Sequence, residues 1–381
     1  MRVIFMLFLQ LGCLSFGGPA AHIGYFRRAF VAQRQWLDDE AFSSLLALCQ
    51  FLPGPASSQL GFSIGYQRAG LKGAIAAFAG FTLPSFVLMW LVAIAGQHWA
   101  GVGWVQGMLH GLKLLAVIVV ADAVWGMLRQ FCPTALPLAL ALSAAAIQWW
   151  APGIGSQLLT LITAALLGKI LLPPATPHSA STEKQGGRLS RLPLLLFLAL
   201  LVLLPWLASA SPWLMLTSQF YQAGSWVFGG GHVVLPLLQQ LVGHTLSNDQ
   251  FLTGYAAAQA MPGPLFTLAS FLGASLIPAH SLLAALLATL AIFLPGFLLL
   301  LAVLPGWQHL RQHPALQQAL AGVNAAVSGL LLAALYQPVF SSAVQQPGDL
   351  AWIVLGWFAL RQLKLPLLAV IAAMMLVGMA F

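Results

Sequence analysis

Apolar segments close to the length of a bilayer span recur along the whole chain, and this pattern limits its folds more than any other feature. A helix needs roughly 20 apolar residues to cross the hydrocarbon core. Only 6% of the 381 residues are charged, whereas a soluble domain carries about 25%. We therefore predict an all-α polytopic membrane protein with no separate soluble domain. The clearest spans are 73–98, 107–128, 135–150, 156–172, 192–208, 281–304, 317–337 and 365–381.

The formal net charge of +8 does not indicate a nucleic-acid partner. Most of the 15 basic residues lie in short loops, whereas a nucleic-acid interface gathers them on one face. In a membrane protein such residues mark cytoplasmic loops, so the expected partner is the lipid bilayer. Cys13, Cys49 and Cys132 are scattered among apolar residues and predict neither a disulfide framework nor a metal site.

Four sequence landmarks of the first half return in the same order in the second half. Their offsets are 209–212 residues throughout, which indicates an internal duplication. The first landmark also argues against a cleaved signal peptide, because its counterpart lies deep in the chain. The matched pairs are Phe16-Gly17-Gly18 with Phe228-Gly229-Gly230, Gln50 to Pro55 with Gln259 to Pro264, Phe81 to Phe86 with Phe293, Pro295 and Phe297, and Leu109 to Lys113 with Leu320 to Asn324.

Loop charges predict that the two repeats are inverted relative to each other. Basic residues mark the loops at 27–34 and 68–72 as cytoplasmic, while the loops at 231–246 and 338–349 of the second repeat carry no Lys or Arg. A single span between the repeats accounts for the inversion. We expect a first repeat at 1–172, a polar cytoplasmic linker at 173–191, a linking transmembrane helix at 192–210 and an inverted second repeat at 211–381.

Two Pro-Gly-Pro sequences are expected to break helices inside the membrane. Residues 38–51 form a predicted half-helix capped by Asp38 or Asp39, and Ser247 with Gln250 forms a predicted capping box in its counterpart. A second half-helix leaves after each Pro-Gly-Pro, so 36–68 is expected to be a hairpin that enters and leaves on one side. For the segment 3–30, a re-entrant or broken helix and a tilted full span both remain open.

The start of each outgoing half-helix is a predicted anion site. The first N–H groups of a helix have no intrahelical partner and carry a partial positive charge. The expected free amides are those of 56–58 and 265–267, with a second set at the glycine breaks. Kinks that only help helices pack closely are the alternative. The expected anion-binding residues of the breaks are Gly17, Gly18, Pro53, Gly54, Pro55, Ser57, Ser58, Gly229, Gly230, Gly231, Pro262, Gly263, Pro264 and Thr267.

Ionisable residues inside membrane segments are functional candidates because they are costly in lipid. Lys113 and its repeat counterpart Asn324 are expected to bind the anion, with a lysine that snorkels to the helix end as the alternative. Asp122 is expected either to relay protons or to pair with a basic group. Further candidates, each with a structural alternative, are Arg27 and Arg28 as a cytoplasmic mouth that gathers anions, and His22 and His232 as groups that titrate near neutral pH.

The sequence contains no catalytic or nucleotide motif: it has no HExxH, no GxSxG and no P-loop. We expect no enzyme activity, no cofactor and no metal site. Active transport by such a chain would draw on the membrane potential or an ion gradient. Paired discontinuous helices in inverted repeats are typical of secondary transporters.

The motifs at the helix breaks occur together in a known family. They are Phe16-Gly17-Gly18-Pro19 followed by His22, the run from Trp36 to Phe42, Gln50 to Pro55, and the counterparts Phe228 to His232 and Gln259 to Pro264. In this combination the chain resembles the chromate ion transporter (CHR) family, in its two-domain form, over nearly its whole length. The second copy departs at Leu246 to Phe251, which lacks the tryptophan and most of the acids of the first.

The resemblance implies export of chromate from the bacterial cytoplasm across the inner membrane, with sulfate as a look-alike anion. A sulfate or other oxyanion importer or exchanger is an alternative, and an intramembrane enzyme or scaffold is an alternative of another class. The sequence leaves open the coupling ion and whether the chain forms a homodimer.

Overall fold

The computed structural model describes residues 1–381 except 17, 100–101, 174–188, 229–233, 244, 311–312 and 381. The described part consists of helices joined by turns and loops, with no strand, so the predicted all-α polytopic membrane architecture is confirmed. The helices in it that are long and apolar enough to cross a membrane are Ala56–Gly96, Gly103–Phe131, Ile154–Leu171, Arg191–Ala210, Pro278–Gly306 and Pro314–Ala343.

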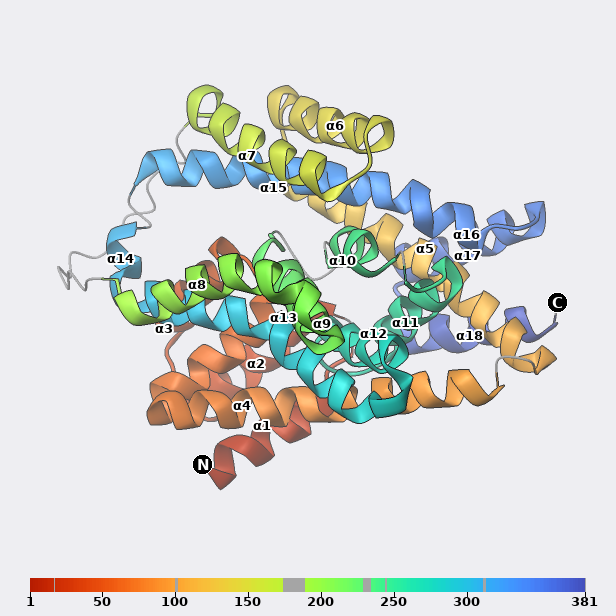
Figure 1. The fold of residues 1–381 in the computed structure, drawn as a ribbon, viewed down its shortest axis with the longest axis horizontal. Coiled ribbons are helices and arrows are strands. Elements are labelled where there is room, and N and C mark those ends of the chain that lie inside the picture. The colour runs from red at the N-terminus through yellow and green to blue at the C-terminus, as the bar shows by residue number, and fades with distance from the viewer. Residues whose placement is uncertain are drawn as a thin grey trace.

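The order of helices in the first half returns in the second half (Figure 1). The first half contains α1 (Arg2–Leu14), α2 (Gly18–Phe26), a π-helical turn at Arg27–Gln33, α3 (Asp39–Phe51), α4 (Ala56–Trp99), α5 (Gly103–Phe131), α6 (Ala135–Trp150) and α7 (Ile154–Leu171). One helix, α8 (Arg191–Leu207), stands between the halves. The second half contains α9 (Pro212–Ser225), α10 (Val234–Val242), α11 (Asn248–Ala260), α12 (Leu268–Leu276), α13 (Ser281–Val303), α14 (Trp307–Leu310), α15 (Pro314–Ala334), α16 (Ser341–Ala343), α17 (Pro347–Arg361) and α18 (Leu367–Ala380).

Helix α4 consists of two helices that meet at a sharp reversal. Ala69 and Gly70 have non-helical backbone angles, and Gly70 has a φ of +59°. The backbone of Gly65 touches that of Gly73 across the turn, which a straight helix would hold far apart. The segment 56–68 therefore folds back on 71–99. Gly273 in α12 touches Ala284 in α13 in the same way, so the second half has the same reversal.

The half-helices begin with the predicted caps. The Asp38 carboxylate accepts a hydrogen bond of 2.7 Å from the amide of Ala41, and Ser247 with Gln250 forms a capping box at the start of α11. Each half-helix before a Pro-Gly-Pro turn packs against the one after it, as Cys49 does against Ser63, with 3.9 Å between Sγ and Oγ. The turns thus sit at the tips of two helical hairpins.

The segment 3–30 also folds back on itself. Phe8 in α1 stacks on Phe30 with 4.9 Å between ring centroids, and it meets Phe26 of α2 edge-on at 5.6 Å. A continuous helix would separate residues 8 and 26 by about 27 Å at 1.5 Å per residue. Of the two alternatives left open by the sequence, the structure therefore has the broken helix.

Corresponding helices of the two halves lie antiparallel at the centre. The Trp90 indole of α4 donates to the Ser281 hydroxyl at the start of α13, at 3.3 Å. Earlier in α4, Phe78 packs on Phe293 and Phe297, which lie later in α13, at 5.0 Å from each ring. Residue numbers therefore increase along α4 in the direction in which they decrease along α13, so the two helices are antiparallel.

The last two helices of each half pack against the other half. Figure 1 shows α6 and α7 lying along α15, while α17 and α18 pack on α5. Glycines allow close backbone contact at matching places: Gly168 meets Gly322, and Gly378 meets Gly111. Because each half holds a long helix of the other, neither half has a complete core alone.

Candidate functional site

The two Pro-Gly-Pro turns are each hydrogen-bonded to the opposite half. The amide of Gly54 donates to the carbonyl of Val227 at 2.7 Å, and the amide of Gly263 donates to the carbonyl of Ser15 at 2.9 Å. Both acceptors immediately precede a Phe-Gly-Gly sequence. The Gly54 and Gly263 amides therefore join the halves and are not available to an anion.

Glycine is required in both turns by conformation and by space. Gly54 has a φ of +120° and Gly263 a φ of +97°, a region that residues with a Cβ rarely adopt. A Cβ on Gly54 would lie 3.1 Å from the Cα of Gly296, and one on Gly263 would lie 2.8 Å from Ser85 Oγ. Ser85 and Gly296 occupy corresponding positions in α4 and α13, so each turn is packed against the other half.

The start of α4 presents free backbone amides at the first turn. Pro55 precedes the helix, and the first intrahelical bond runs from the Gln59 amide to the Pro55 carbonyl at 2.9 Å. The amides of Ala56, Ser57 and Ser58 come before that bond and have no intrahelical acceptor. These amides lie beside the helix break, and the N-terminal end of the helix adds a partial positive charge there.

The second half does not reproduce this arrangement. Its first turn is a 3₁₀ turn at Leu265–Thr267, in which the Thr267 amide bonds the Pro264 carbonyl at 3.0 Å. The Thr267 hydroxyl donates to the same carbonyl at 2.8 Å. The expectation of three free amides and a free hydroxyl at 265–267 is wrong for Thr267, because a tighter turn uses both groups.

His22 links the first helix break to the start of α4. It is buried, with its Nε2 3.1 Å from the Ser15 carbonyl and its Nδ1 3.3 Å from the Ser57 hydroxyl. A carbonyl only accepts, so Nε2 carries a hydrogen. The edge of the ring packs on Phe81 at 5.3 Å. The imidazole ring of His22 therefore bridges the Ser15 carbonyl and the Ser57 hydroxyl.

Four buried polar atoms around His22 and the start of α4 have no hydrogen-bond partner among the described residues. They are Ser15 Oγ, Ser58 Oγ, Gln59 Oε1 and Thr82 Oγ1. Buried polar groups are nearly always satisfied, so these four atoms are candidates to contact a ligand. Ser58 was predicted, but Ser15, Gln59 and Thr82 were missed. Ser15 and Gln59 lie close to the helix breaks in sequence, and Thr82 lies in the repeat landmark that begins at Phe81.

The corresponding positions in the second half are mostly apolar. Val227 replaces Ser15, Phe266 replaces Ser57 and Leu268 replaces Gln59 at the offsets of the repeat. All three are hydrophobic and bury in the core. The polar site therefore belongs to the first half, although both halves build its walls.

Lys113 lies in an ion pair in this structure. Its ammonium nitrogen in α5 is 2.7 Å from Asp249 Oδ1 at the start of α11. The lysine side chain is 8% exposed and the aspartate 70%, so the cation is buried and its partner faces outward. Its predicted counterpart Asn324 lies in α15, where its backbone carbonyl accepts from Ser328.

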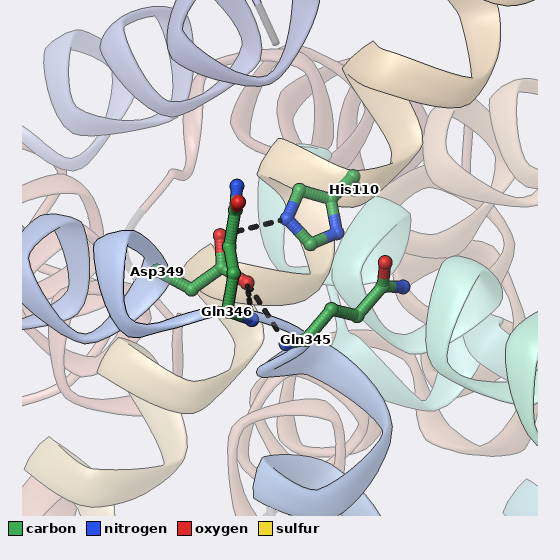
Figure 2. Close-up of polar contacts among 4 residues, drawn as sticks. All are labelled: His110, Gln345, Gln346 and Asp349. Carbon is green, nitrogen blue, oxygen red and sulfur yellow. Dashed lines mark hydrogen bonds and ion pairs between the residues drawn. The ribbon is translucent and has the colours of Figure 1, made fainter.

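Asp122 and His110 also pair α5 with the second half. Asp122 bonds Arg361 of α17 at 2.5 Å, so of its two predicted roles the structure has the ion pair. Figure 2 shows His110 Nε2 directed at Asp349, 3.0 Å from Oδ1, while Asp349 Oδ2 accepts from the amides of Gln345 and Gln346. Burial alone would raise the pKa of Asp349, but these hydrogen bonds outweigh it and the pKa lies below its ordinary value.

The remaining predicted site residues lie elsewhere. Arg27 pairs with Asp39 at 2.8 Å where both are exposed, and Arg28 is exposed beside it. Gly18, with a φ of +74°, begins α2. Among the residues that the structure describes, no group of His, Cys, Asp and Glu could hold a metal ion. The predicted residues that lie outside the described part are Gly17, Gly229, Gly230, Gly231 and His232.

Comparison with known proteins gives one consistent match. The model of a family described as "Chromate transporter" matches residues 2–169 and 214–379. The chain is 29% identical to a "Probable chromate transport protein" of Synechococcus elongatus, over 96% of this chain and 92% of that protein. It is 27% identical to a "Chromate transport protein" of Cupriavidus metallidurans, over 100% and 92%, and 26% identical to an uncharacterized transporter of Methanocaldococcus jannaschii, over 87% and 82%. No solved structure matches.

Proposed function

The chain belongs to the chromate transporter family, and on that premise we propose that it exports chromate, or a related tetrahedral oxyanion, from the bacterial cytoplasm. It is a multi-pass protein of the inner membrane and a transporter rather than an enzyme. Export, energy source and the choice of oxyanion are the parts that we propose.

The observation that carries the proposal is the start of α4, where Ser57 and Ser58 are buried. A helix N-terminus binds anions through its free amides and partial charge. Here the amides of Ala56 to Ser58 begin α4, and His22 connects Ser57 of this turn to Ser15. The buried Ser15 Oγ and Ser58 Oγ have no partner in the described structure. Hydroxyls and amides donate to the oxygens of a tetrahedral anion, so these groups form its binding site.

Inverted repeats would give this site its alternating access. The antiparallel packing of α4 against α13 and the opposite loop charges support that arrangement. The Gly54–Val227 and Gly263–Ser15 bonds cross between the halves at the site. A rocking of one half against the other would then open the site to one side at a time.

The membrane potential is sufficient to drive export. Moving one charge across 100 mV is worth about 2.3 kcal/mol. An oxyanion that leaves a negative cytoplasm would gain about 4.6 kcal/mol as a dianion, enough for a gradient of about a thousandfold, and about 2.3 kcal/mol as its monoprotonated form, enough for about fiftyfold. Import would have to overcome the same amount. We therefore propose electrogenic or weakly proton-coupled export, with Lys113 and the start of α4 holding the anion in transit.

Growth in chromate tests the proposal. Cells that express the protein should survive added chromate and accumulate less of it than cells with an empty vector. A Gly54→Leu variant expressed to the same level in the membrane is the matched control and should confer no protection. Equal chromate accumulation with and without the protein would contradict export.

A further inference from the structure

Chromate and sulfate are both tetrahedral dianions, so shape and charge alone separate them poorly. They differ in basicity: chromate gains a proton near neutral pH, whereas sulfate does so only in strong acid. At neutral pH a fraction of chromate therefore carries a hydroxyl group that can donate a hydrogen bond, and sulfate carries none. A binding site can use that difference only if it contains a hydrogen-bond acceptor.

Gln59 supplies such an acceptor. Its Nε2 donates to the carbonyls of Pro53 at 2.9 Å and Gly296 at 3.0 Å. Both partners are carbonyl oxygens, so the orientation of the amide is fixed, with nitrogen on that side. Its Oε1 points the other way, is fully buried and has no partner among the described residues. This oxygen can only accept.

The Gln59 amide lies directly over the helix break. Gln59 follows the first turn of α4, and helix side chains lean toward the N-terminus. Its Nε2 is 3.0 Å and its amide carbon 3.4 Å from where a Cβ of Gly54 would be, so the amide group packs on the Pro-Gly-Pro turn. The free amides of α4 and the unpartnered Ser58 hydroxyl are at this turn. The site therefore combines several donors with one buried acceptor.

We propose that this site binds the monoprotonated form of the oxyanion, with Gln59 Oε1 accepting a hydrogen bond from its hydroxyl. The inference rests on the proposed function and names the form of the substrate. A bare dianion would set an oxygen against Oε1, which repels it and leaves a buried acceptor unpaired. Sites built around such a hydrogen bond reject analogues that lack the donor. The contact thus excludes sulfate.

The second half lacks the groups that form this site, so we infer one such site in each chain. Leu268 occupies the position of Gln59 there, at the same offset of 209 residues that relates Gly54 to Gly263. Thr267, which corresponds to Ser58, is already bonded to Pro264. The matching position of a similar turn in the same protein is therefore a leucine, and for this reason Gln59→Leu is the test variant.

The test uses the purified full-length protein in liposomes, with the potential clamped and isotope-labelled chromate as the probe. Initial uptake is measured across the pH range in which chromate gains its proton, with and without excess sulfate. Uptake by the wild type should follow the monoprotonated fraction, and sulfate should inhibit weakly at every pH. If a protein group were titrating instead, inhibition by sulfate would rise in parallel with chromate uptake, and the proposal would be wrong.

Two variants sharpen the result. Gln59→Leu removes the acceptor together with the two hydrogen bonds of Nε2, so it should lower chromate uptake by about tenfold or more and should lose both the pH preference and the discrimination against sulfate. Ser58→Ala removes a donor only, so it should lower uptake while the pH profile stays that of the wild type. A Gln59→Leu protein that keeps the wild-type pH profile and still excludes sulfate would overturn the proposal.

Failure of the inference is distinct from failure of the proposed function. Uptake of chromate that follows the dianion, or that sulfate inhibits equally at all pH values, would refute the role of Gln59 and leave chromate transport standing. No chromate uptake at any pH would refute the proposed function itself.

Discussion

The amide nitrogen of Gly263 lies 2.9 Å from the carbonyl oxygen of Ser15, so a helix break of the second half is bonded to a helix break of the first. The Gly54–Val227 bond, at 2.7 Å, repeats this contact with the halves exchanged. The two hydrogen bonds hold four helix breaks together around the start of α4. The site therefore depends on both halves, although its polar side chains come mainly from one.

Replacing Gly54 or Gly263 with leucine should abolish transport while the protein remains in the membrane. The added side chain would strain a positive φ and collide with Gln59 or Ser85, which displaces the turn from the free amides. Gly126→Leu is the matched control, because nothing lies within 4 Å of a Cβ there. Transport assays on equal amounts of membrane protein check this, and full activity of both turn variants would contradict the helix-end site.

Single cysteines at Leu189 and Gly348 should react with an impermeant reagent from opposite sides of the membrane. Leu189 lies near the end of the polar linker and is 41% exposed, and the loop charges predict that it is cytoplasmic. Gly348 is exposed at the start of α17 with open space around it, in a loop region expected outside. The three native cysteines are first removed. Labelling of both positions from one side would overturn the inverted topology.

Variants of the Lys113–Asp249 pair should separate two roles of the lysine. If Lys113 attracts the anion, Lys113→Met lowers transport by about tenfold, which corresponds to about 1.4 kcal/mol, while Asp249→Asn frees the ammonium and preserves transport. If the ion pair only joins α5 to α11, both variants lose the same ion pair and should lower the transport rate by the same factor. We expect the first pattern, measured as initial rates of chromate uptake.

Asp349→Ala should destabilise the protein by about 3 kcal/mol, because it leaves His110 and two backbone amides without their buried acceptor. Asp349→Asn, which keeps an acceptor oxygen, should cost less. Because the pKa of Asp349 is lowered, its contribution is present above the ordinary aspartate pKa and is lost as pH falls through the folded-state value. Thermal unfolding in detergent at neutral and acidic pH measures both effects; an Asp349→Ala protein as stable as the wild type would contradict them.

The helix breaks could be predicted from sequence because local chemistry determines them. Pro-Gly-Pro cannot continue a helix, and the caps at Asp38 and Ser247 are local side-chain contacts. The loop charges also predict a loop at 68–72, between the outgoing half-helix and the span at 73–98, and the reversal at Ala69 and Gly70 lies in it.

Long-range partners could not be predicted from the sequence. The Asp122–Arg361 and His110–Asp349 pairs form only because α17 packs on α5 of the other half. Gln59 was missed for the same reason, because its amide is oriented by Gly296, 237 residues away. Side chains that act across the interface between halves carry no local signal.

Uptake of chromate into inverted membrane vesicles tests the central claim most directly. The cytoplasmic face of such vesicles is outward, so export appears as uptake, and a lumen-positive potential should drive it. We predict chromate uptake that exceeds the uptake of sulfate, molybdate and phosphate, that valinomycin with potassium slows markedly by collapsing the potential, and that Gly54→Leu abolishes. Chromate uptake no greater than in vesicles without the protein, or uptake indifferent to potential that follows an imposed pH gradient instead, would contradict electrogenic export through this site.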